Sequence, residues 1–91
     1  MAVTRDEAKL YLRIDNDVEY ALIDSLIQSS TTTVENVLRH PLSDYTTLPE
    51  DIKTAILYGV AYLYENRDTA DFDAMIKLMR AMLFSYRDEV F

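Results

Sequence analysis

The 91 residues suffice to enclose one hydrophobic core, so we expect a single domain over residues 1–91. Sixteen acidic and nine basic residues give a net charge of -7, which argues against a protein that binds nucleic-acid phosphates tightly. The absence of cysteine excludes disulfides and thiolate sites. The sequence has neither an apolar signal segment nor the ~20-residue apolar run of a membrane span, so we expect a cytoplasmic protein with no membrane contact.

The N-terminal part of the sequence predicts a short helix followed by a long one. The sequence TRDE (residues 4–7) has the form of a capping box and opens a helix that runs to about Arg13. Either Asp15 or Asp17 can cap the next helix, which we expect from about Val18 to Arg39. The apolar residues of that range share one broad face at helical spacing. They are Leu22, Ile23, Leu26, Ile27, Val34, Val37 and Leu38.

A loop with the sequence HPLSDYTTLPE leads into a third helix. Thr47, with Glu50 three residues later and Pro49 in the first turn, predicts a second capping box. The helix extends to about Asn66 and is apolar nearly all round, which is typical of a helix central to a core or wedged between subunits. Gly59 in its middle costs about 1 kcal/mol relative to alanine. We therefore expect another helix to cross closely at this glycine.

The last predicted helix runs from about Asp71 to Phe84, and the chain then ends in a tail. One face of this helix carries its large apolar side chains, which we expect in the core. They are Phe72, Met75, Ile76, Met79, Met82, Leu83 and Tyr86. No segment has the two-residue period of a strand, so the predicted fold class is all-α, a small bundle of about four helices.

The sequence lacks the residue patterns expected of an enzyme. The single histidine, His40, lies in a loop and has no second histidine at a metal-binding spacing. One glycine cannot form a glycine-rich phosphate loop. We therefore predict a protein that is not an enzyme and needs no metal or cofactor.

The sequence DSL at residues 24–26 offers an alternative function, because a small acidic helical protein with this motif resembles an acyl carrier protein. In that family the modified serine opens a helix, whereas Ser25 is predicted well inside the long helix. The acyl-carrier reading and a generic helical protein-interaction module both remain alternatives.

The sequence LYENRD (residues 63–68) ends the third helix with charged and polar residues. On a helical wheel, Asn66 and Arg67 continue the apolar stripe, so both side chains need polar partners. We predict a structural clamp in which Asn66 binds loop backbone and Arg67 binds a carboxylate. Asp15 and Asp17 are the predicted partners of Arg67.

Four aromatic residues are predicted to contact other molecules. Tyr58 and Tyr62 lie on the second apolar side of the third helix, where we expect a subunit contact. Phe84 falls about 180° from Met75 on the fourth helix, and Phe91 is the last residue given. Aromatic side chains outside the packed face often dominate interface energies, so we predict that Phe84 and Phe91 anchor a neighbour or partner.

Three segments together resemble the phage head–tail connector family of tailed phages, and they cover nearly the whole chain. They are AKLYLRIDNDVEYALIDSLIQSSTTTVENVLRHPL, PEDIKTAIL followed by LYENRD, and MLFSYRDEVF. The chain departs from the family in SSTTT, where alanines are frequent, and in Ser85, where proline is frequent.

This resemblance implies a structural adaptor in the virion neck, encoded by a phage or prophage and present in the host cytoplasm during assembly. Its implied partners are further copies of itself in a ring, the portal protein and tail-completion proteins. DNA is expected to pass through the ring without specific binding, in keeping with the acidic composition.

Overall fold

The computed structural model describes residues 3–13, 20–66 and 68–86 of the chain. It contains four α-helices, α1 (Arg5–Leu12), α2 (Tyr20–Leu38), α3 (Glu50–Glu65) and α4 (Phe72–Leu83). Two short 3-10 helices, η1 (Leu42–Asp44) and η2 (Phe84–Tyr86), follow α2 and α4. The described ranges include no strand, so the predicted all-α bundle is confirmed.

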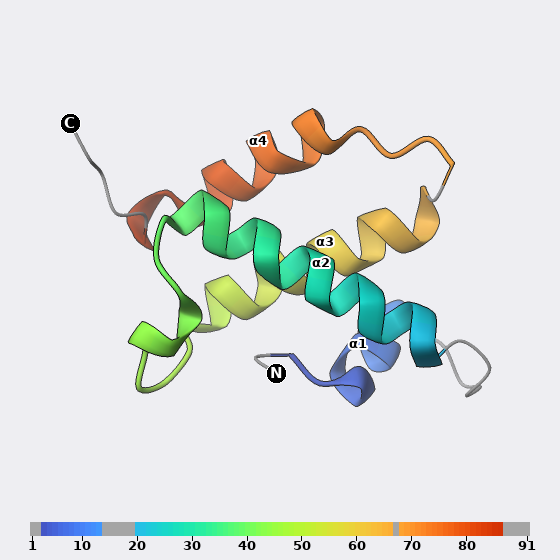
Figure 1. Cartoon of the computed structure of the whole chain (residues 1–91), viewed down its shortest axis with the longest axis horizontal. Helices are drawn as coiled ribbons and strands as arrows, with labels where there is room; N and C mark the ends of the chain where they lie inside the picture. The colour runs from blue at the N-terminus through green and yellow to red at the C-terminus, as the bar shows by residue number, and fades with distance from the viewer. Residues whose placement is uncertain (1–2, 14–19, 67, 87–91) are drawn as a thin grey trace.

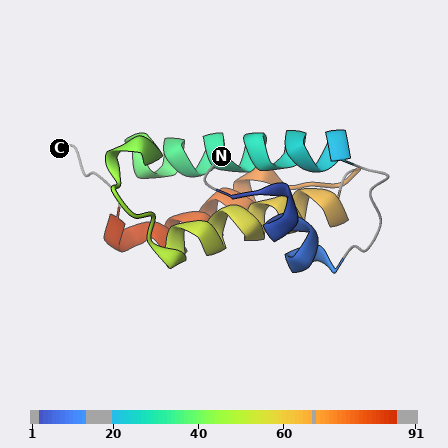
Figure 2. The same ribbon diagram turned by 90° about the horizontal axis from the view of Figure 1, so that it is seen from below.

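The helices form two layers with a crossed arrangement. Figure 1 shows α2 crossing α3 near the middle of both helices, with α4 along one edge of the molecule and α1 along the other. Seen from below, α2 occupies one layer while α3 and α4 occupy the other (Figure 2). Both edges of the molecule are therefore formed by helices that pack on the central pair from one side only.

The core is built from the apolar faces of all four helices, together with Val3 before α1. The predicted face of α2 is confirmed for its five most buried apolar residues, whereas Leu22 and Leu26 are half-buried. In α3 the predicted stripe is buried from Ile52 to Leu63, and in α4 the buried residues are Met75, Met79 and Leu83. The core residues of α2 are Ile23, Ile27, Val34, Val37 and Leu38.

The close crossing predicted at Gly59 is confirmed. A Cβ atom on Gly59 would lie 2.1 Å from Ser30 Oγ of α2 and 2.5 Å from Met79 Cε of α4. Ser30 is fully buried, and its hydroxyl donates to the Ile56 carbonyl at 2.7 Å. Three helices thus meet at a point where only glycine leaves room, and a serine of α2 binds the backbone of α3 there.

The first predicted capping box is confirmed and the second is wrong. Thr4 Oγ1 accepts from the Glu7 amide at 3.1 Å, and Glu7 Oε1 accepts from the Thr4 amide at 3.0 Å. By contrast, α3 begins at Glu50 with Pro49 as its N-cap and has no side-chain capping bond, so Thr47 lies outside the helix. The reason is steric, because a residue that precedes proline is disfavoured from helical geometry and the helix cannot start before Pro49.

The start of α4 also differs from the sequence-based expectation at one residue. Asp71 caps the helix by accepting from the Ala74 amide at 3.1 Å. Phe72 was expected in the core but is 53% exposed. In the first turn of α4 it faces the polar side of α2 and lines a hollow with Ser29 and Thr32. Its position on the helical wheel is that of a core residue, but no apolar surface lies opposite.

Candidate interaction surfaces

The described residues contain no cluster of three histidine, aspartate or glutamate side chains that could hold a metal ion. His40 Nε2 lies 2.8 Å from the Tyr45 hydroxyl, so the histidine is part of the packing of the loop after α2. Ser25 is exposed within the body of α2 and does not open a helix. No helix in the described ranges has the length and apolar character needed to cross a membrane.

Exposed apolar side chains are the distinctive surface feature of the described residues, and they divide between the two edges of the molecule. On the α1 edge, Leu10 is 82% exposed and Tyr11 is also exposed. On the α4 edge, Phe72 and Leu78 are exposed, and Phe84 in η2 is 65% exposed. Side chains of this size that remain in water on a small domain are candidates for contact with another protein.

The first candidate surface, the α1 surface, consists of Leu10, Tyr11 and Leu57. These residues line a shallow hollow of about 290 Å³ together with Glu7, so α1 and α3 both contribute to it. Leu57 comes from the outward side of α3 and is half-buried. The surface is a continuous apolar strip across two helices rather than a single exposed leucine.

Two ion pairs fix α1 in place and so shape this surface. Both carboxylate oxygens of Asp24 on α2 accept from Arg5, with a distance of 3.0 Å from Nε to Oδ1. Lys53 Nζ on α3 lies 2.9 Å from Glu7 Oε2. The hydrogen bond from Arg5 lowers the pKa of Asp24, and the bond from Lys53 lowers the pKa of Glu7. The helix is thus tied to both central helices by charge-assisted bonds.

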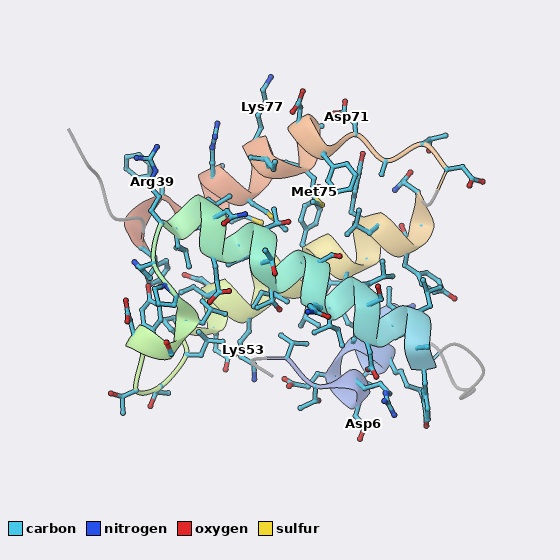
Figure 3. The ribbon with its side chains drawn as sticks, in the orientation of Figure 1. Asp6, Arg39, Lys53, Asp71, Met75 and Lys77 are labelled. Atoms are coloured by element: carbon cyan, nitrogen blue, oxygen red, sulfur yellow. The ribbon has the colours of Figure 1, made fainter. Side chains whose placement is uncertain are left out.

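The second candidate surface, the α4 stripe, consists of Lys77, Arg80 and Phe84. Their spacing of three and four residues places them on one side of α4 and its 3-10 extension. Lys77 points outward from this edge of the molecule (Figure 3). Within the described part of the chain, neither Lys77 nor Arg80 has an ion-pair partner. The stripe therefore offers two positive charges that have no ion pair among the described residues, beside an exposed aromatic ring.

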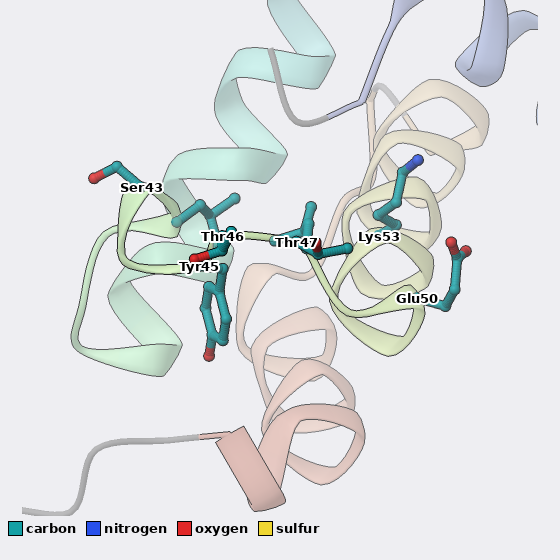
Figure 4. Close-up of a pocket in the computed structure, with 8 residues that line it drawn as sticks. Ser43, Tyr45, Thr46, Thr47, Glu50 and Lys53 are labelled. Carbon is teal, nitrogen blue, oxygen red and sulfur yellow. The ribbon is translucent and has the colours of Figure 1, made fainter.

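The third candidate surface, the loop groove, lies where the segment after α2 meets the start of α3 (Figure 4). It has a volume of about 470 Å³. Leu42 and Leu48 are half-buried and pack against the core beneath it, while Glu50 contributes a carboxylate to its lining. The lining residues are Leu42, Ser43, Tyr45, Thr46, Thr47, Leu48, Glu50 and Lys53.

Hydrogen bonds from two sides hold the loop groove in shape. Leu42 donates its amide to Glu35 Oε2 of α2 at 2.9 Å, which ties η1 to that helix. The Tyr86 hydroxyl of η2 donates to Asp51 Oδ2 at the start of α3, at 3.1 Å. The groove is thus a surface fixed by α2, α3 and η2 rather than an isolated loop.

The predicted structural clamp is described in part. Asn66 Nδ2 donates to the Tyr62 carbonyl at 2.9 Å, and the Asn66 carbonyl accepts from the Thr69 amide at 3.1 Å. Asn66 thus ends α3 and begins the turn into α4, and its side chain bonds to α3 rather than to loop backbone. Arg67, Asp15 and Asp17 lie outside the described residues, so their pairing stays a prediction.

The structure separates the four aromatic residues predicted at interfaces. Tyr58 and Tyr62 are half-buried and pack against the core, with ring centroids 6.2 Å apart. Burial raises the pKa of Tyr58. The Tyr62 hydroxyl accepts from the Asp71 amide at 2.9 Å and so braces the turn before α4. Phe84 is exposed, and Phe91 lies outside the described residues.

Sequence reasoning missed Leu10, Tyr11 and Leu78 as exposed apolar residues. A signal was available for Leu10, because it falls about 160–200° from Ala8 and Leu12 on a helical wheel. A short helix with apolar residues on both sides cannot bury all of them. The loop groove had no comparable signal, because its lining comes from an irregular segment whose path depends on the packing of η1 and α3.

Comparison with known proteins identifies the family. The model of the family described as phage gp6-like head-tail connector protein matches residues 3–90. No curated protein and no solved structure matches the chain. The match covers all the described residues. The chain belongs to the phage gp6-like head-tail connector family, and its role is that of a structural connector in the neck of the virion.

Proposed function

We propose that this connector assembles as a ring between the portal protein and the tail, where it extends the DNA channel and offers a joining surface to tail-completion proteins. The ring consists of copies of this chain, and the portal is its template. The family supports a structural role among phage head and tail proteins, and the surfaces of the subunit support assembly into a ring.

The observation that carries the proposal is the placement of exposed apolar side chains on both edges of the molecule. Leu10 and Tyr11 lie on the α1 edge, while Leu78 and Phe84 lie on the α4 edge. A subunit in a closed ring that joins two other structures contacts two neighbouring copies and at least one further protein, so it needs several exposed surfaces.

The charge of the chain supports a channel that DNA can traverse. The net charge is -7, with 16 acidic residues against nine basic ones. Tight binding to DNA requires lysine and arginine to displace the counterions of many phosphates, and each neutralised phosphate adds to the affinity. A predominantly acidic ring would not retain the DNA that passes through it.

Native mass spectrometry of the chain, alone and with the portal protein of the same phage, tests this proposal. We expect small species for the chain alone and a single high-mass complex with a fixed copy number when the portal is present. A chain that stays unassembled with the portal at all protein concentrations would contradict the ring.

A further inference from the structure

We propose that adjacent subunits join by seating the α4 stripe of one subunit in the loop groove of the next, so that Phe84 enters the groove and Lys77 and Arg80 face its acidic rim. The inference rests on the ring of the proposed function and adds the surfaces through which that ring closes. The occupant of the groove is therefore a second copy of this chain.

Charge complementarity favours this pairing. The stripe carries Lys77 and Arg80, and neither has an ion-pair partner in the described ranges. The groove segment carries Asp44 and Glu50, which likewise lack an ion pair there. The one cation of the groove lining, Lys53, is already paired with Glu7 at 2.9 Å. Lys77 and Arg80 thus meet the carboxylates of Asp44 and Glu50, of which Glu50 also interacts electrostatically with Lys53 of its own subunit. The opposite charges steer association and fix the register of the contact.

The apolar parts of the two surfaces also match. Phe84 is 65% exposed, and an aromatic side chain gains most when a fitted pocket removes it from water. The loop groove has a volume of about 470 Å³ and is floored by Leu42 and Leu48, which pack against the core. Thr46 and Thr47 of the lining are exposed, and their hydroxyls can bind water or the backbone of the neighbouring subunit at the rim.

The stripe and the groove are different surfaces of the subunit, formed by different elements. Lys77 points away from the molecule at the edge formed by α4, whereas Lys53 of the groove lies toward the opposite edge (Figure 3). A contact between two different surfaces is head-to-tail, and it repeats from subunit to subunit until the ring closes.

The α1 surface is a less suitable seat for the stripe. The one charged residue that lines it is Glu7, whose carboxylate is already paired with Lys53 at 2.9 Å. The lining of the α1 surface therefore has no carboxylate without an ion pair to attract a basic stripe. We assign the neighbouring subunit to the loop groove rather than to the α1 surface.

Disulfide trapping gives a direct test, because the natural chain contains no cysteine. A variant with both Phe84→Cys and Thr47→Cys is assembled with the portal protein and then oxidised. A disulfide forms only when the two Cα atoms lie within about 7 Å, so we expect a ladder of cross-linked subunits on a denaturing gel. The matched control, Phe84→Cys with Leu10→Cys, is expected to stay monomeric. A ladder in the control and none in the test variant would overturn the assignment.

Charge exchange provides a second measurement on the same complex. Arg80→Glu and Glu50→Arg are each expected to lower ring yield by about tenfold or more, because like charges then face each other. Both substitutions in one chain should restore the yield, and Asp6→Arg on the α1 edge should leave it unchanged. Circular dichroism confirms that each variant folds, and Asp44→Lys replaces Glu50→Arg if that variant does not.

The outcomes separate this inference from the proposed function. In one outcome the natural chain forms rings, while the Phe84 and Thr47 cysteines fail to cross-link and the double charge exchange fails to restore assembly. That result would contradict the pairing of stripe and groove but leave the proposed ring intact. If the natural chain forms no ring with the portal, the proposed function fails and the inference fails with it.

Discussion

Ser30 and Gly59 show how a single pair of small residues sets the packing of this bundle. The Ser30 hydroxyl donates to the Ile56 carbonyl at 2.7 Å, and Gly59 provides the space that the serine occupies. Glycine at this position destabilises the helix by about 1 kcal/mol relative to alanine. In return, α2 and α3 approach closely at the centre of the core.

Gly59→Ala is expected to destabilise the fold. The new Cβ would lie 2.1 Å from Ser30 Oγ and 2.5 Å from Met79 Cε, so both side chains must move. Overpacking of a core typically costs about 1–3 kcal/mol, and the better helix propensity of alanine offsets about 1 kcal/mol of that. We expect the Tm to fall by roughly 4–8 °C for each kcal/mol of net loss.

A double-mutant cycle with Ser30→Ala checks the cause of this loss. Removal of the Ser30 hydroxyl eliminates the closest clash, so Gly59→Ala should cost less in the Ser30→Ala background than in the natural chain. Equal costs in the two backgrounds would show that the crossing of α2 and α3 does not set the requirement for glycine.

Arg39 illustrates a second residue whose backbone geometry limits stability. It ends α2 with a φ of 66°, in the left-handed region that favours glycine. We expect Arg39→Gly to raise the free energy of unfolding by about 0.5–1 kcal/mol. Arg80→Gly is the matched control, because it places glycine inside α4 and should lower stability by about 1 kcal/mol. Urea denaturation measures the free energy of unfolding of each variant, which should rise for Arg39→Gly and fall for Arg80→Gly.

At the scale of the elements, two ion pairs help to hold the short helix α1 against the rest of the bundle. It is only eight residues long, and of its residues only Ala8 is fully buried. Arg5–Asp24 and Glu7–Lys53 connect it to the two central helices. The side chains of Arg5 and Asp24 are 38% and 36% exposed, so solvent screens the pair and its contribution is modest.

Acid should weaken the docking of α1. The pKa values of Asp24 and Glu7 are both lowered in the folded protein. Such carboxylates stabilise the fold above their unfolded pKa values, and the contribution is lost as the pH falls through the folded values. The loss therefore begins below about pH 4, near the ordinary pKa values of these groups.

Asp24→Asn tests this dependence. We expect the variant to melt a few degrees below the natural chain at pH 7, with the gap narrowing as the pH drops below about 4. Asp68→Asn is the control, because Asp68 is exposed in the turn after α3 and has no partner in the described ranges. A gap that is the same at pH 7 and pH 3 would show that the charge of Asp24 does not stabilise α1.

The sequence predicted those elements whose signals are local. The capping box at Thr4 and the apolar spacing of α2 and α4 depend on nearby residues, and the structure confirms them. The burial of Phe72 and of Ser30 could not be predicted from local signals, because it depends on which part of another helix packs against each residue. Phe72 has a core position but faces polar residues of α2, and Ser30 is polar but is buried by α3.

The candidate surfaces were only partly predictable for the same reason. Phe84 stood out because it falls opposite the core face of its own helix, and it is exposed as expected. The loop groove is assembled from η1, the segment after it and the start of α3, and it depends on contacts far apart in sequence, such as Leu42 with Glu35 and Tyr86 with Asp51.

At the scale of the whole molecule, this connector is a thin, flat subunit. Its principal extents are 45, 31 and 17 Å, with exposed apolar residues on the edges formed by α1 and α4. A flat subunit with two different contact surfaces, here the α4 stripe and the loop groove, can repeat around an axis. The α1 surface then remains available to a protein other than a neighbouring copy.

Tail joining in a purified system tests the central claim most directly. DNA-filled heads made without this chain are mixed with purified tails and tail-completion proteins, and tailed particles are counted by electron microscopy. The account predicts tailless heads until the natural chain is added, full recovery with it, and poor recovery with Arg80→Glu. Tailed particles formed at the natural yield without the chain would contradict its role as the connector between head and tail.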